Sequence, residues 1–222
     1  MTERDDRFAA ALRGWGPIGI AATIAIALTG PVLEPLGAVL TLAWRWRSHT
    51  PWRDLGLYRP PSWPLTVAAG IGIGVALKLV MKALVMPLLG APPVNPVYHY
   101  LAHNSAALPG MMFDVIVGAG FNEELVFRGF LFHRLGQLLG HGRWATATIL
   151  FLTSVWFGIV HYPGQGWPGA EQAFFTGLVL GGLYLATRRL WVSMIAHAAF
   201  DIVAVLIIFW DLETRVAHWI FR

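Results

Sequence analysis

The sequence contains no cysteine and few charged residues. Without cysteine, the chain has no disulfide, no thiol nucleophile and no thiolate ligand for zinc. Charged residues make up only 13% of its 222 residues, against about 25% in a typical soluble domain. This shortage of charge excludes an ordinary soluble fold.

Apolar residues take the place of the missing charge. They make up 56% of the chain and gather in long runs, and about 20 mostly apolar residues suffice for a transmembrane helix. The sequence therefore predicts an all-α, polytopic transmembrane helical bundle of six spans. The first span contains Pro31, Glu34 and Pro35, and two half-spans there would raise the count to seven. The predicted spans are 16–44, 64–89, 109–136, 144–162, 170–187 and 189–210.

Positive charge is unevenly divided among the connections. Arginines occur in the connection 45–63, in the turn 134–143 and at Arg188 and Arg189, whereas 90–108 and 163–169 contain neither lysine nor arginine. The positive-inside rule places the arginine-containing connections in the cytoplasm. The net charge of +4 thus indicates membrane orientation rather than nucleic-acid binding. We expect a multi-pass protein of a bacterial-type inner (plasma) membrane, with membrane lipids as partners.

Two adjacent carboxylates lie near the middle of the predicted span 109–136. Ionisable residues inside a span are costly and mark functional candidates. Glu124 precedes Arg128 by four residues, so the two lie on one helical face and are expected to form a supporting ion pair. Glu123 is rotated from Glu124 by about 100° around the helix axis. It is therefore available to act as a general base in a polar cavity.

Histidines occur in two further predicted spans. His161 ends the span 144–162, and His197 precedes Asp201 by four residues in the last span. Counting residues along the spans puts Glu123 and His197 at distances from the cytoplasmic face that differ by about 8 Å, and it puts His161 further still from that face. Tilted or kinked helices are needed to bring these groups together.

Two chemistries fit these side chains. Glu123, His161 and His197 could bind a divalent metal such as zinc and activate a water molecule, the usual three-ligand pattern. Alternatively, Glu123 and His161 act as bases without a metal, while His197 and Asp201 stabilise the oxyanion. Spacing alone also leaves two other functions open: a small proton-linked transporter and a non-catalytic immunity or scaffold protein.

The spacing of these residues resembles the three motifs of the CPBP family. This family, also called ABI, includes type II CAAX prenyl endopeptidases and bacteriocin-processing proteins, and the similarity covers about residues 112–205. The motifs read Glu123-Glu124-x-x-x-Arg128, Phe157-x-x-x-His161 and His197-x-x-x-Asp201.

The resemblance implies an intramembrane protease whose substrate is a peptide or protein with a cleavage site near the membrane. It further implies accessory spans and an external loop in residues 1–108, and a catalytic bundle in 109–222. Members of the family often have asparagine where this chain has Asp201, so Asp201 either orients His197, carries a proton or binds a metal. The implied roles are water activation by Glu123 and His161, assistance by His197 and Asp201, and support by Glu124 and Arg128.

Overall fold

A computed structural model describes residues 3–29, 33 and 35–221 and is helical throughout, with no strand in these residues. The all-α prediction is therefore confirmed. Pro31 and Glu34, which interrupt the first predicted span, lie outside the described residues. The helices are α1 (Glu3–Arg13), α2 (Pro17–Thr29), α3 (Leu36–Arg47), η1 (Trp52–Leu55), α4 (Trp63–Val80), η2 (Met81–Val85), α5 (Met86–Leu88), η3 (His99–Leu101), α6 (Leu108–Phe113), η4 (Asp114–Glu123), η5 (Leu125–Leu131), α7 (Phe132–Leu139), α8 (Arg143–Thr187), α9 (Leu190–Phe209) and α10 (Glu213–Ala217).

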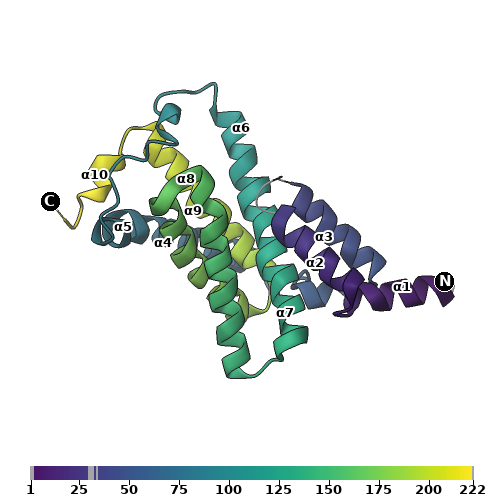
Figure 1. The fold of residues 1–222 in the computed structure, drawn as a ribbon. Coiled ribbons are helices and arrows are strands. Elements are labelled where there is room, and N and C mark those ends of the chain that lie inside the picture. Colours follow the sequence, from purple (N-terminus) through teal and green to yellow (C-terminus); the bar gives the residue numbers. More distant parts are fainter. Residues whose placement is uncertain (1–2, 30–32, 34, 222) are drawn as a thin grey trace.

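A helical rod from α6 to α7 runs through the middle of the molecule (Figure 1). Its central segments η4 and η5 have the wider π winding, which often occurs at functional sites. Gly120 lets this rod approach α9, because a Cβ there would lie 2.9 Å from the Cβ of Ala198. The rod thereby brings Glu123 to the face of α9.

Helix α8 is a hairpin of two arms rather than one straight helix. Gly166 interrupts it with φ 65° and ψ −166°, a conformation that favours glycine. A Cβ on Gly158 would lie 2.9 Å from Ala170 O, and one on Gly177 would lie 3.2 Å from Ser154. The arm before Gly166 therefore packs antiparallel to the arm after it.

Three helices in the described residues are long and apolar enough to cross a membrane: Trp63–Leu88, Arg143–Thr187 and Leu190–Phe209. The count rises to four if α1 and α2, which are bent by 58°, form one span. The prediction of six or seven spans is therefore corrected. Runs 144–162 and 170–187 are the two arms of Arg143–Thr187, which is counted as one candidate although the chain reverses at Gly166, and α2 and α3 have only 13 and 12 residues. The rod contains too many charged residues to qualify as a single apolar span.

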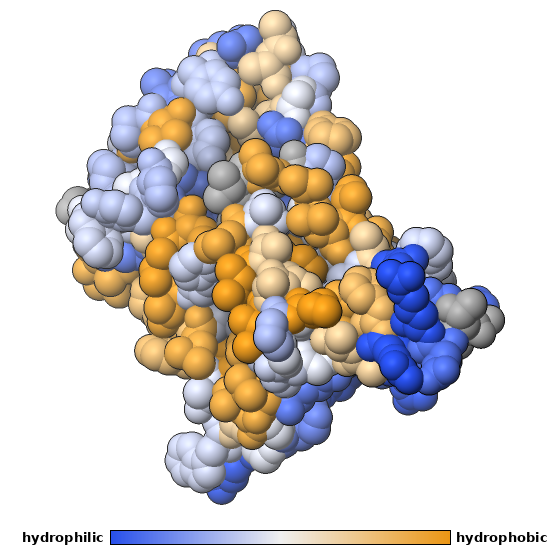
Figure 2. Space-filling model, turned by 45° about the vertical axis from the view of Figure 1, so that its right-hand side comes forward, coloured by the Kyte–Doolittle hydropathy of each residue, from blue (hydrophilic) through white to orange (hydrophobic). Residues whose placement is uncertain are grey.

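The surface of the molecule agrees with a membrane location. Figure 2 shows apolar residues gathered in a band across the middle, with more hydrophilic residues above and below it. Large apolar side chains that are exposed on the spanning helices include Ile71, Phe151 and Ile159. Lipid is the environment in which such exposure costs nothing.

The arginine-containing connections lie at one end of the molecule and the uncharged ones at the other (Figure 1). At one end, the N–H of Leu190 donates to Gly56 O at 3.0 Å, which joins the connection 45–63 to the turn before α9. At the other end, Gln165 donates to the hydroxyl of Tyr98 at 3.2 Å. The structure thus separates the two kinds of connection as the sequence predicts, while their cytoplasmic and external assignment stays a prediction. The division at residue 108 likewise stays a prediction.

One of these arginines is not a loop charge. Arg134 lies in α7 with 0% exposure and donates hydrogen bonds to Arg13 O and, at 2.7 Å, to Gly14 O. Carbonyl oxygens at the end of a helix have no partner within that helix. Arg134 therefore holds α7 against the break between α1 and α2, which corrects its assignment to the turn 134–143.

Close packing of α4 on α9 depends on two small residues of α4. A Cβ on Gly70 would lie 2.7 Å from Ile195, and one on Gly74 would lie 2.2 Å from the backbone oxygen of Ala196. Gly70 and Gly74 therefore permit the close approach of α4 to α9. This contact fixes which residues of α4 face the site described below.

We expect Gly74→Ala to destabilise the protein by about 1–3 kcal/mol, because the added methyl group must push α4 away from the backbone of α9. The matched control is Gly72→Ala on the same helix, where a Cβ meets nothing within 4 Å. The thermal midpoint in detergent micelles should fall for the first variant only. Equal midpoints for both variants would contradict the packing described here.

Candidate active site

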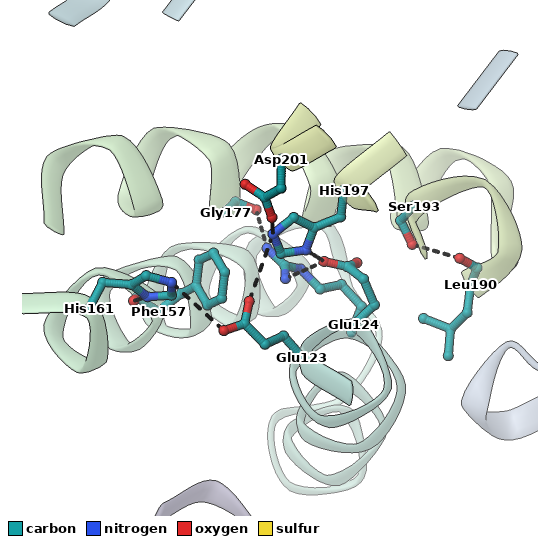
Figure 3. A network of polar contacts seen from close by, with 10 residues as sticks. Glu123, Glu124, Phe157, His161, Gly177, Leu190, Ser193, His197 and Asp201 are labelled. Atoms are coloured by element: carbon teal, nitrogen blue, oxygen red, sulfur yellow. Dashed lines mark hydrogen bonds and ion pairs between the residues drawn. The ribbon is translucent and has the colours of Figure 1, made fainter. Parts of the chain in front are cut away.

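Glu123 lies at the end of η4 with 5% exposure, and its carboxylate points toward two imidazole rings (Figure 3). Its Oε1 is 3.7 Å from His161 Nε2, and its Oε2 is 3.7 Å from His197 Nε2. These side chains come from the rod, the first arm of α8 and α9. The structure therefore brings the three groups together, despite the difference in depth expected from span counting.

His161 is oriented by its own helix. Its Nδ1 lies 2.7 Å from Phe157 O, one turn earlier in α8. A carbonyl oxygen only accepts, so Nδ1 carries the hydrogen and donates it. In the neutral ring, Nε2 is then an acceptor, and it is this atom that faces Glu123.

His197 is surrounded by carboxylate oxygens from three residues. Its Nδ1 lies 2.8 Å from Glu124 Oε1, while its Nε2 faces Glu123 and lies 3.4 Å from Asp201 Oδ2. Nδ1 thus has a hydrogen-bond acceptor, and Nε2 lies within ion-pairing distance of two further carboxylates. Asp201 lies one helical turn after His197, within reach of its ring, and the three alternative roles given for Asp201 stay predictions.

Glu124 and Arg128 form the predicted ion pair. Arg128 Nη1 lies 2.7 Å from Glu124 Oε1, and the two side chains are 2% and 0% exposed. Arg128 Nη2 also donates to Gly177 O at 3.4 Å. The pair therefore joins the rod to the second arm of α8, and its carboxylate holds His197 in place.

Phe157 has a structural part in the site that its motif position alone did not indicate. Its ring is 1% exposed and lies 4.5 Å from the ring of His161 and 5.9 Å from that of His197. The guanidinium carbon of Arg128 lies 4.7 Å from its centroid. Phe157 packs against both imidazoles and shields the buried ion pair.

A cavity of about 800 Å³ opens beside these groups. Its walls include Glu123, His161, His197 and Asp201, together with residues of α4 and of the connection 90–108. Lys78 of α4, which belongs to none of the three motifs, also lines it. Its charge within an apolar span was the signal that could have identified it.

The part of the chain that the structure describes has no group of three or more His, Cys, Asp or Glu side chains positioned to hold a metal ion. The carboxylate of Glu123 faces both imidazoles, but this arrangement does not fit a three-ligand site as it stands. The predicted zinc ligation by Glu123, His161 and His197 is therefore not supported and stays a prediction.

Comparison with known proteins gives one match. Residues 105–203 match the family model of the Rce1-like type II CAAX prenyl endopeptidases. No curated protein and no solved structure matches the chain. The match contains Glu123, His161, His197 and Asp201, and with the apolar helices it identifies an integral membrane protein with a CAAX-protease type of domain. Residues 105–203, which supply all of the clustered side chains, are therefore similar to the Rce1-like type II CAAX prenyl endopeptidase domain.

Proposed function

We propose that the protein is an intramembrane endopeptidase that hydrolyses a peptide bond with water activated by Glu123 and His161. The observation that carries this proposal is the 3.7 Å separation of Glu123 Oε1 and His161 Nε2. Both atoms are hydrogen-bond acceptors, and they lie too far apart for a direct bond. One water molecule can donate a hydrogen to each of them, which directs its oxygen lone pair away from both.

The reaction then needs two proton transfers and one hydrogen bond to the oxyanion. The water oxygen attacks the peptide carbonyl carbon while Glu123 or His161 accepts a proton, which forms a tetrahedral oxyanion. His197 acts here in its doubly protonated form: Glu124 accepts the Nδ1 hydrogen, and the second hydrogen, on Nε2, is donated to this oxyanion. Collapse of the intermediate breaks the C–N bond and passes the proton taken from water to the leaving nitrogen, which yields one carboxylic acid and one amine.

The ion pair and Asp201 have supporting roles in this scheme. Arg128 balances the charge of Glu124, so that Glu124 can accept from His197 without adding an unpaired buried charge. Asp201 accepts from His197 Nε2 before substrate binds and turns the ring toward the site. In this scheme no step passes through a metal.

The family description supports a substrate class. The matched family is named for prenylated CAAX tails, and the cavity is bounded by helices that carry apolar residues to the lipid. We therefore propose a prenylated C-terminal tail as the substrate. A bacterial-type plasma membrane as the location stays a prediction.

The test uses the purified full-length chain in liposomes. The probes are two peptides of one sequence, with a farnesylated or an unmodified cysteine in a Cys-aliphatic-aliphatic-X tail, in water enriched in oxygen-18. We expect cleavage of the farnesylated probe, with one heavy oxygen in the new carboxyl terminus, because water is the nucleophile. If the folded protein cleaves neither probe, the proposed function is wrong.

A chelator arm distinguishes the two chemistries. Addition of EDTA or 1,10-phenanthroline should change the rate by less than about twofold, because no step in the scheme needs a metal. A loss of activity that zinc restores would instead support ligation by Glu123, His161 and His197.

A further inference from the structure

The chain has only two lysines, Lys78 and Lys82, and both line the cavity that contains the candidate active site. Every other basic side chain apart from the histidines is an arginine. Both lysines lie outside the segment 105–203 that matches the family. The family match therefore assigns them no role.

The position of Lys78 follows from the packing of α4 on α9. Gly70, Gly74 and Lys78 are four residues apart and lie on one face of α4. The two glycines contact Ile195 and Ala196, so the next position on this face meets the following turn of α9. There the ammonium group of Lys78 lies 4.6 Å from the ring centroid of Phe200, the residue before Asp201.

The charge of Lys78 is buried without an ion pair. The side chain is 7% exposed, and its Nζ donates to Gln172 Oε1 at 3.2 Å. Among the described residues, no carboxylate oxygen lies within ion-pairing distance of this nitrogen. An ammonium group inside a membrane span is costly, which favours a functional role over a purely structural one.

Lys82 offers a contrast one helical turn further on. Its Nζ lies 3.1 Å from Glu213 Oε1 and donates to Pro93 O at 2.6 Å. The same Glu213 oxygen accepts from the N–H of Asn95 at 2.9 Å. Lys82 therefore ties the connection 90–108 and α10 to the spanning helices, and its charge is already matched.

We infer that Lys78 binds a carboxylate of the substrate and so determines which peptides the cavity accepts. This inference rests on the proposed function and adds a specificity-determining residue to it. An ammonium group with one neutral acceptor retains donors for a carboxylate, and such charge-assisted hydrogen bonds are short and strong. The carboxylate comes either from the free C-terminus of the peptide or from an acidic side chain in the tail.

The experiment compares three versions of the farnesylated probe: a free C-terminal acid, a C-terminal amide, and an amide with one glutamate in the tail. The wild-type chain should cleave at least one carboxylate-containing probe about 10- to 100-fold faster, by kcat/KM, than the plain amide. Preference for the acid alone identifies the C-terminus as the source, and preference for the glutamate probe identifies a side chain. Equal rates for all three would overturn the inference while leaving the proposed function intact.

Two variants assign the preference to a residue. Lys78→Met should remove the preference and leave the amide rate within about threefold of wild type, whereas Lys78→Arg should retain a preference because a guanidinium also binds carboxylates. Lys82→Met is the matched control and should keep the wild-type preference, even if it lowers the thermal midpoint. A preference that survives in Lys78→Met would show that another group binds the carboxylate.

A binding readout tests the inference separately from catalysis. In Glu123→Gln, an amine-reactive label on Lys78 can be located by mass spectrometry, with Lys82 as the internal reference. A carboxylate-containing probe should protect Lys78 from labelling and the amide should not. If the wild-type chain cleaves no probe and the carboxylate probes do not protect Lys78, both proposals are wrong. If Lys78 is protected but no probe is cleaved, Lys78 remains the carboxylate-binding residue and only the proposed hydrolysis is rejected.

Discussion

Glu123→Gln is expected to lower kcat by about 10²- to 10⁴-fold, the usual contribution of a general base. The amide has nearly the same size and shape as the carboxylate but cannot accept a proton from water. Since the amide fills the same space in the cavity wall and can still form hydrogen bonds, the variant should fold as well as the wild type. Single-turnover cleavage of the farnesylated probe and the thermal midpoint measure the two effects.

Glu171→Gln provides the matched control for this variant. It makes the same change in an apolar helix, at a position that does not line the cavity. We expect wild-type rates from it. A Glu123→Gln variant that keeps the wild-type cleavage rate would contradict the peptidase mechanism, and one that keeps its cellular phenotype without cleavage would favour the scaffold alternative. Uptake of a charged solute into the same liposomes would instead indicate a transporter.

Arg128→Met is expected to destabilise the protein by about 3–5 kcal/mol, because it leaves the buried carboxylate of Glu124 without its cation. Arg128 also donates to Gly177 O and lies against the ring of Phe157, so the contact between the rod and α8 is weakened as well. Activity should fall together with stability, since Glu124 holds His197. The thermal midpoint measures the loss of stability, and the rate of probe cleavage measures the loss of activity.

The double variant Arg128→Met/Glu124→Gln separates charge from packing. Removal of both charges leaves no unpaired ion, so more than half of the lost stability should return. A double variant that is no more stable than Arg128→Met would show that packing against Phe157 and α8, and not the buried charge, accounts for the destabilisation.

The contacts that the sequence predicts best are local ones. Glu124 and Arg128, and likewise His197 and Asp201, are four residues apart, and the pitch of a helix alone brings such side chains together. The structure has both contacts, at 2.7 Å and 3.4 Å. A wider π winding in η5 does not alter this outcome.

Hydrophobicity separates 144–162 from 170–187 correctly, because the chain reverses at Gly166 between these two arms of α8. Span counting failed in the first predicted span, where α2 and α3 have only 13 and 12 residues. The charges that make the rod chemically important are also those that remove it from the set of apolar spans. Composition therefore identifies a membrane protein more securely than it counts the crossings.

The amino-acid sequence by itself determined the helical class, the separation of arginine-containing connections from uncharged ones, and the identity of the ionisable residues within apolar segments, because these depend on composition and short spacings. Only the tertiary structure decided that Glu123, His161 and His197 meet, and that Lys78 faces the same cavity. Those contacts join residues from four helices, and their distances depend on the close approach at Gly74 and Gly120 and on the reversal at Gly166. Such long-range packing involves every side chain along the interfaces, so no local spacing can predict it.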